Sequence, residues 1–179
     1  MKKKALLMLL LLVAVFTLSG CKKDEKNEEK ETKENNKIEI VISDEGFGKT
    51  TLSYDKDKDY EVKQEKTGKY TTTTIVSKKE NFKLELYHFD TVEDSWNLQK
   101  DSRSKKDGYK EYNWNKLEGY SFEGDKYSVK LNVKLATSDY KIKALFGEMS
   151  YESYAEADVL NTFNSSSVQD LLNSITFKE

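Results

Sequence analysis

The chain offers few side chains for acid–base or nucleophilic chemistry. It holds a single histidine, His88, and a single cysteine, Cys21, which leaves out histidine pairs and metal sites built from several cysteines. Asp90 follows His88 by two residues, a spacing that places both side chains on one side of a strand. Such a pair could move protons, but no serine stands in the context of a nucleophile elbow. A hydrogen-bonded histidine at a strand end is the favoured interpretation, so we assign no catalytic residue.

Two short motifs imitate ligand sites and depart from them at decisive positions. Residues 48–50 (Gly-Lys-Thr) resemble the end of a phosphate loop, but Ser43 replaces the first glycine and a strand-forming run follows where a helix is required. Residues 55–59 (Asp-Lys-Asp-Lys-Asp) resemble the start of a calcium loop, but Tyr60 and Lys66 replace the glycine and the bidentate glutamate. Both are interpreted as turns, and the sequence predicts no metal site and no cofactor.

Aromatic residues make up 12% of the chain, and several lie close together in sequence. Tyrosine and tryptophan give stiff contact surfaces with a polar tip, which suits the binding of a glycan or a protein. Strands that alternate tyrosine with lysine would produce the same composition without a binding role. As a hypothesis we assign a binding patch to Trp96, Tyr109, Tyr112, Trp114 and Tyr120.

Acidic residues near these aromatics suggest an alternative from another class. Glycosidases use two carboxyl groups about 5–10 Å apart. A hydrolase of this kind would need two of the nearby acids to meet in a concave pocket with aromatic walls. The candidates are Asp90, Glu93, Asp94, Glu111, Glu118 and Glu123.

The first 21 residues have the pattern of a secretory signal. Lysines at positions 2–4 precede an apolar run over residues 5–16, and a run of about 12 residues is too short to cross a hydrocarbon core of roughly 30 Å. Residues 18–21 (Leu-Ser-Gly-Cys) resemble the lipobox of bacterial lipoproteins. The resemblance implies cleavage between Gly20 and Cys21 and transfer of a diacylglyceryl group to the Cys21 thiol. An ordinary secretory signal or an uncleaved anchor is the alternative.

The lipobox implies a location on the extracytoplasmic face of the cell membrane, with the membrane as partner through the lipid on Cys21. Lys22, rather than an aspartate, follows the cysteine, so the signal for retention at the inner of two membranes is missing. Arg103 is the only arginine among 30 basic residues. Together these features favour a bacterium with a single membrane.

Charge and composition divide the rest of the chain. The 30 basic residues balance 32 acidic ones, which argues against nucleic acid as a partner. Residues 22–36 contain no apolar side chain, so we expect a disordered tether. The predicted organisation is therefore a signal peptide (1–20), a lipidated cysteine with its tether (21–36) and one domain (37–179).

Hydrophobic periodicity predicts an α+β domain: an antiparallel sheet with two or three helices on one face. A helix is expected over residues 92–105, capped by Asp90 or Thr91, a second over 167–174 and a weak one over 154–163. Alternating patterns predict the strands, and their number also suits a small barrel or sandwich. The predicted strands cover residues 38–42, 51–54, 60–64, 70–77, 82–88, 109–114, 120–123, 127–135 and 140–146.

Residues 171–177 (Leu-Leu-Asn-Ser-Ile-Thr-Phe), together with the order of hairpins, mid-chain helix, long strands and short last helix, resemble the PsbP/Mog1-like group. That group includes small bacterial lipoproteins whose terminal phenylalanine plugs the sheet edge. The resemblance implies a fold and no functional residue, because the group shares no catalytic motif. A cystatin-like or NTF2-like fold is the alternative.

These observations favour a non-enzymatic lipoprotein that binds a protein or glycan of the cell envelope, or serves as an accessory subunit there. The carbohydrate-active hydrolase is one alternative. A structural spacer in a surface assembly is the other.

Overall fold

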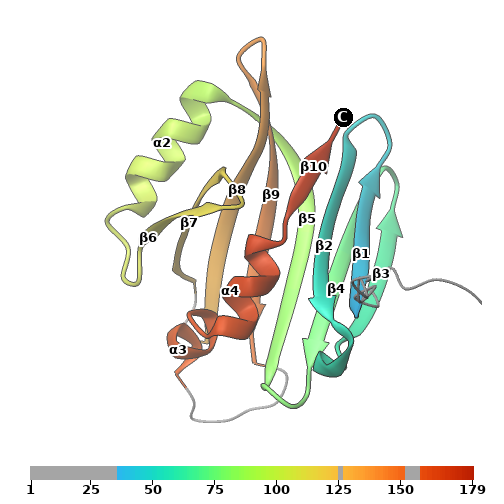
Figure 1. The fold of residues 1–179 in the computed structure, drawn as a ribbon. Helices are drawn as coiled ribbons and strands as arrows, with labels where there is room; N and C mark the ends of the chain where they lie inside the picture. Colours follow the sequence, from blue (N-terminus) through green and yellow to red (C-terminus); the bar gives the residue numbers. More distant parts are fainter. Residues whose placement is uncertain (1–35, 125–126, 152–157) are drawn as a thin grey trace, which may run out of the picture. The chain divides into compact units, whose positions relative to one another are not determined.

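Alternating apolar side chains form ten antiparallel strands in the part of the chain that the computed structural model describes, residues 36–124, 127–151 and 158–179 (Figure 1). One sheet has the order β1-β2-β10, and the other has the order β3-β4-β5-β9-β8-β7-β6. Within the described residues, β3 and β6 are the two edge strands of the larger sheet and do not pair with each other. The sheet is therefore open and not a closed barrel. The fold is α+β, as predicted.

The small sheet begins with a hairpin of β1 (Lys37–Asp44) and β2 (Gly48–Asp55). Ile40 and Ile42 point into the core, whereas Val41 between them is exposed, which is the predicted alternation. β10 (Thr176–Lys178) then pairs with β2, a strand that the sequence patterns did not predict. Gly48 permits this approach, since a Cβ there would lie 2.8 Å from the Lys178 carbonyl oxygen.

The large sheet is a series of hairpins around two long central strands. β3 (Glu61–Thr67) and β4 (Tyr70–Ser77) lead into β5 (Phe82–Val92), which pairs with β9 (Lys141–Ser150). β6 (Lys110–Trp114), β7 (Leu117–Glu123) and β8 (Ser128–Ser138) complete it. The short 3₁₀ helix η1 (Lys56–Lys58) lies between β2 and β3.

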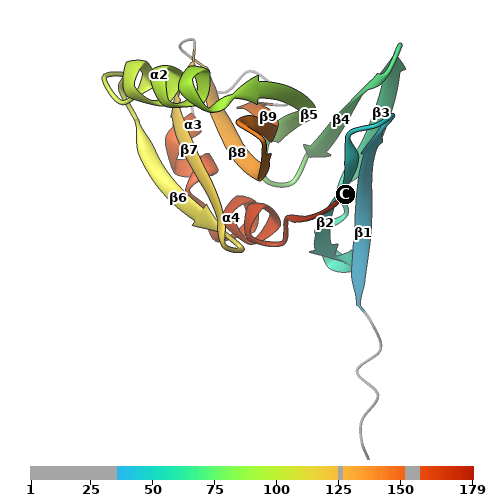
Figure 2. The same ribbon diagram turned by 90° about the horizontal axis from the view of Figure 1, so that it is seen from above.

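Helices cover both faces of the large sheet, so the prediction that all helices lie on one face is wrong. Ala144 and Leu145 are adjacent in β9 and both fully buried, and neighbours in a strand point to opposite faces. The Leu145 face packs against α4 (Ser166–Asn173) and α3 (Val159–Phe163), whereas the Ala144 face packs against Trp96 of α2 (Glu93–Arg103). Figure 2 shows α2 and α4 on opposite sides of β8.

The predicted helices are present with shifted ends. α2 begins after Val92, and neither Asp90 nor Thr91 caps it; the backbone N–H of Glu93 instead donates to the carbonyl of Tyr140 at 3.0 Å. α4 matches its prediction to within one residue at each end. α3 forms the end of the predicted 154–163 helix and is capped by Asp158, while residues 152–157 lie outside the described residues.

Candidate functional site

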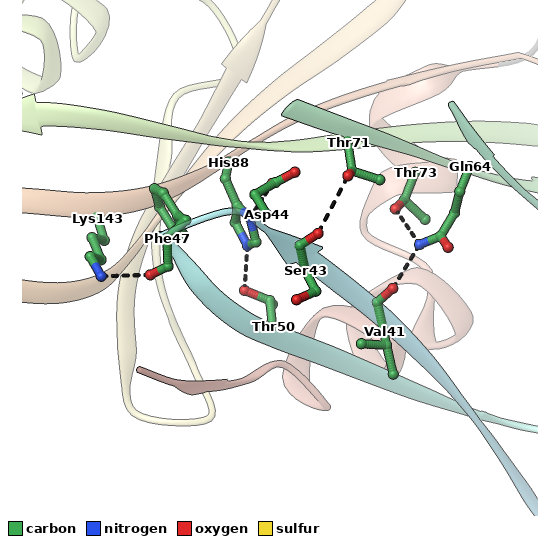
Figure 3. A network of polar contacts seen from close by, with 10 residues as sticks. All are labelled: Val41, Ser43, Asp44, Phe47, Thr50, Gln64, Thr71, Thr73, His88 and Lys143. Carbon is green, nitrogen blue, oxygen red and sulfur yellow. Dashed lines mark hydrogen bonds and ion pairs between the residues drawn. The ribbon is translucent and has the colours of Figure 1, made fainter. Parts of the chain in front are cut away.

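A buried chain of hydrogen bonds joins β1, β2 and β5 (Figure 3). Asp44 ends β1 on the inward phase of Ile42, and His88 continues the inward phase of the apolar residues of β5. The Nδ1 atom of His88 lies 2.5 Å from Oδ2 of Asp44, and its Nε2 atom lies 2.7 Å from Oγ1 of Thr50. The favoured interpretation of His88 as a hydrogen-bonded histidine is confirmed. Its carboxylate partner is not Asp90, which is exposed, but Asp44, which lies 44 residues earlier.

Burial fixes the protonation of this network. Burial lowers the pKa of His88, and the hydrogen bond to Asp44 raises it by less, so the imidazole is neutral at pH 7. Because a carboxylate can only accept, Nδ1 carries the proton, and the hydroxyl of Thr50 then donates to Nε2. Hydroxyl, imidazole and carboxylate thus stand in the order used by hydrolases with a catalytic triad.

The Thr50 hydroxyl is closed off from solvent in this structure. Thr50 is fully buried, and the ring of Phe47 stacks on His88 with 4.2 Å between centroids and 11° between planes. In this arrangement the network orients the Asp44 carboxylate rather than activating a nucleophile.

Side chains of the large sheet hold β1 in place above the network. Gln64 donates from Nε2 to the carbonyl of Val41 at 2.7 Å, and Thr71 donates from Oγ1 to the carbonyl of Ser43 at 3.4 Å (Figure 3). These bonds occupy backbone acceptors on the free edge of β1. They also fix the position of Asp44, the next residue along the strand.

One atom of the network has no partner. Oδ1 of Asp44 makes no hydrogen bond with any described residue, although the side chain is only 3% exposed. Figure 3 shows this second oxygen pointing away from the imidazole. A buried carboxylate oxygen without a donor is unfavourable by about 1–3 kcal/mol or more, so a hydrogen-bond donor placed at Oδ1 of Asp44 would stabilise the network.

Two neighbouring cavities border the β1–β2 turn, and Asp44 lines the smaller of them. The larger, of about 760 Å³, lies between the β1–β2 turn, the end of β5, the start of α2 and the β8–β9 hairpin. Its polar lining includes Asp90, Thr91, Ser95, Ser138, Lys141 and Lys143. The smaller, of about 120 Å³, is lined by Asp44, Glu45, Phe47, Lys69, Tyr70 and Asp90. Gly46 and Asp90 line both, so the two cavities are neighbours.

Lys143 fixes the turn that separates the cavities from the network. Its Nζ atom donates to the carbonyl of Phe47 at 2.5 Å and lies 3.5 Å from the Glu179 carboxylate. It also lies 5.4 Å from the ring centroid of Phe47 and 5.9 Å from that of Phe177. The floor of the site is therefore held by contacts from β9 and from the chain beyond β10.

The predicted aromatic patch is wrong as a binding surface. Trp96, Trp114 and Tyr120 are each only 1% exposed, and the five residues divide between opposite faces of the large sheet. Trp96 and Tyr109 pack around Tyr120 on the α2 face, whereas Tyr112 stacks on Trp114 on the α3 and α4 face. Tyr112, Trp114 and Tyr120 are close in sequence because β6 and β7 are neighbouring strands, and side chains of a strand point alternately to opposite faces.

Of the six candidate carboxylates, the structure brings together Glu111 and Glu118. Lys100 lies between them, 2.9 Å from Glu111 and 3.0 Å from Glu118, and Lys134 lies 3.1 Å from Glu118. Hydrogen bonds from Lys100 and Tyr109 lower the pKa of Glu111. Burial raises the pKa of Glu118, but the two lysines lower it by more. A glycosidase acid needs a raised pKa, so this pair does not support that hypothesis.

The remaining candidates are spread over the surface. Glu93 and Asp94 lie in the exposed first turn of α2 and Glu123 ends β7, while Asp90 lines both cavities. Residues 55–59 surround η1, as expected for a turn. Residues 48–50 begin β2, so their interpretation as a turn is wrong: the turn lies at residues 45–47. No described group of three or more histidine, cysteine or acidic side chains is arranged to hold a metal ion.

The comparisons with protein families, curated proteins and solved structures give no match for this chain. Among residues 36–124, 127–151 and 158–179, no helix has the length and apolar character needed to cross a bilayer. The predicted signal, its cleavage site at Gly20 and Cys21, and the tether up to residue 35 lie outside the described residues.

Proposed function

We propose that the chain is a lipid-anchored, extracytoplasmic lipoprotein whose domain (37–179) binds a small polar molecule of the cell envelope. The anchor rests on the Leu-Ser-Gly-Cys motif at residues 18–21. The binding function rests on one observation, the cavity of about 760 Å³ beside Asp90. Its volume lies within the range of about 300–1,000 Å³ that is common for small-molecule sites.

The lining of this cavity favours a polar ligand. Hydroxyl groups of Thr91, Ser95 and Ser138 can donate and accept hydrogen bonds, and side chains of both charges stand among them. The walls come from both sheets and from α2, and Lys143 fixes one wall by its bond to the Phe47 carbonyl. Such fixed walls allow binding without a large cost of ordering.

The domain is further proposed to be PsbP/Mog1-like. The antiparallel sheet between α2 and α4 supports this assignment, as does the last strand, which places Phe177 beside Gly48. Because that group shares no catalytic motif, the assignment agrees with binding rather than catalysis.

Hydrolysis is a second candidate, favoured by the order Thr50–His88–Asp44. The ester p-nitrophenyl acetate distinguishes the two. If the domain only binds, the full chain and its Thr50→Val variant release nitrophenol at the same slow rate. If Thr50 is a nucleophile, the wild type shows a burst that the variant lacks.

The anchor is tested on the full chain expressed in a bacterium with a single membrane. We expect detergent to be required for its release and mass spectrometry to find a diacylglyceryl group on Cys21. The Cys21→Ala variant should keep its signal peptide. An unmodified amino terminus on the wild-type protein would overturn the anchor.

The cavity is tested by nuclear magnetic resonance on the full chain in detergent micelles, with free amino acids and monosaccharides as probes. We expect at least one class to give saturable shifts confined to residues that line the larger cavity. Ser138→Trp, which places a large ring at the cavity wall, should abolish them, whereas Leu98→Trp on exposed α2 should not. Shifts that never saturate, or that survive Ser138→Trp, would favour a structural spacer.

A further inference from the structure

The smaller cavity has an excess of negative charge. Carboxylates of Asp44, Glu45 and Asp90 line it together with one ammonium group, that of Lys69. His88 behind Asp44 adds no positive charge, because burial lowers its pKa. Lys143 is the cation on the other side of the β1–β2 turn, and its ammonium group is engaged by the Phe47 carbonyl and by Glu179.

Acidic residues at a surface are common, but here one of them is buried and one of its carboxylate oxygens has no hydrogen-bond partner among the described residues. Asp44 is 92% buried, and Oδ1 has no hydrogen-bond partner among the described residues. The imidazole holds the other oxygen, Oδ2. A buried carboxylate oxygen of this kind requires a hydrogen-bond donor, preferably one with a positive charge.

The walls of the smaller cavity also suit a cation. Phe47 and Tyr70 both line it, and aromatic faces attract ammonium groups. Tyr70 already shows this contact, because the Nζ atom of Lys69 lies 5.2 Å from its ring centroid. Since Lys69 is exposed, its side chain can move aside for a ligand.

We propose that the smaller cavity binds a primary ammonium group, with Asp44 and Asp90 as its acceptors. This inference rests on the proposed binding function and names the chemistry of the ligand. Gly46 and Asp90 border both cavities, so the rest of the ligand extends into the larger one. There the hydroxyls of Ser95 and Ser138 meet its polar part.

A primary ammonium group fits better than a metal ion or a quaternary amine. The described residues contain no group of three metal-ligating side chains. A quaternary amine has no N–H and would leave Oδ1 of Asp44 without a donor. A primary ammonium group has three N–H donors, enough for Oδ1 of Asp44 and the carboxylate of Asp90 together.

The single histidine of the chain provides a specific reporter. With ¹³C-labelled histidine, the full chain in detergent micelles gives one imidazole signal, from the ring that contacts Asp44. The probes are n-propylammonium chloride, tetramethylammonium chloride, 1-propanol and sodium chloride. We expect a saturable shift with n-propylammonium, binding at least about tenfold weaker with tetramethylammonium, and no shift with 1-propanol or sodium chloride.

Two charge-removing variants locate the site. Asp90→Asn should weaken n-propylammonium binding about tenfold, and because Asp90 is exposed this variant should fold. Asp94→Asn removes the same charge in the first turn of α2, outside both cavities, and should leave the affinity unchanged. Asp44→Asn should abolish binding where that variant is folded.

Equal affinity for the two ammonium ions would overturn the proposal, because it would show attraction by charge alone. The absence of a saturable shift would also overturn it and would mean that water satisfies Oδ1 of Asp44. If n-propylammonium is silent while other probes still shift residues of the larger cavity, this inference fails and the proposed function stands.

Discussion

Two polar networks of this domain use the same kinds of groups with opposite results. The network of Asp44, His88 and Thr50 is buried between β1, β2 and β5, and one of its carboxylate oxygens has no partner among the described residues. The network of Lys100, Lys134, Glu111 and Glu118 lies at the surface across α2, β6, β7 and β8, and its two carboxylates meet two ammonium groups. Both carboxylates of the surface network meet a positive charge, whereas the described partner of the Asp44 carboxylate is the neutral imidazole of His88.

The pKa shifts express the same difference. In the surface network, burial lowers the pKa of Lys100, but the hydrogen bonds to Glu111 and Glu118 raise it by more, so Lys100 and the two glutamates keep their charges. In the buried network, burial outweighs the carboxylate and keeps His88 neutral. Balanced charges hold the surface network together, whereas the unpartnered oxygen of Asp44 beside a cavity is the basis of the proposed binding site.

The largest expected effect is that of His88→Ala. The change removes a ring packed on Phe47 and leaves both Asp44 and Thr50 without their partner. Urea unfolding at pH 7 should show a loss of about 3–5 kcal/mol. A loss below about 1 kcal/mol would place this network on a level with the surface one and end the comparison.

Thr50→Val should have the next largest effect. Valine keeps the shape but removes the hydroxyl, so Nε2 of His88 becomes a buried acceptor without a donor. We expect a loss of about 1–3 kcal/mol in the free energy of unfolding. Thr51→Val is the matched control. The Thr51 hydroxyl forms an exposed hydrogen bond with Thr176, so its loss should lower the free energy of unfolding much less.

Sequence patterns predicted most of the elements because apolar alternation in β1, β5 and β8 is a local signal. They did not predict β10, because three residues are too few to show a period. The two-sided burial of β9 was visible as Ala144-Leu145, yet adjacent apolar residues also occur in helices. The helix faces were therefore assigned wrongly.

The candidate site was harder to predict than the fold. His88 was interpreted as a hydrogen-bonded histidine, but its partners Asp44 and Thr50 lie 44 and 38 residues away, and only the packing of three strands brings them together. Thr50 belongs to the motif at residues 48–50, which was interpreted as a turn, so its side chain was not considered as a partner of His88. The binding patch was predicted from the residue types alone, because tyrosine and tryptophan are common at binding surfaces. The same residue types also fill cores, and Trp96, Trp114 and Tyr120 are buried there.

Acidity should weaken the fold through His88. Its pKa lies below the ordinary value of 6.5 in the folded state, so between these two values the unfolded chain binds a proton that the folded chain does not. Stability is therefore fully present above about pH 6.5 and decreases as the pH falls. From pH 7.5 to 5.5 the loss should approach about 1 kcal/mol.

Urea unfolding at both pH values measures this effect, with His88→Gln as the comparison. The variant lacks the single histidine, the side-chain type whose ordinary pKa lies in this window, so its stability should change much less between the two values. An equal loss in wild type and variant would assign the pH dependence to other groups and remove His88 from the account.

The smallest effect belongs to the surface network. In Lys100→Met, Glu111 and Glu118 lose their shared cation, but water screens these partly exposed groups, and we expect a loss of at most about 1 kcal/mol. Wild-type stability should move towards that of the variant in about 1 M salt, where the screening length is about 3 Å. Lys105→Met, which removes only the exposed pair with Asp101, should change nothing measurable.

The same network should respond to acid. Because Lys100 lowers the pKa of both glutamates, the greater stability of the wild type over Lys100→Met should disappear as the pH falls below about 4.5. A larger, salt-independent loss would show that the surface network is as tightly built as the buried one, and the distinction between a stabilising network and a binding network would then need another basis.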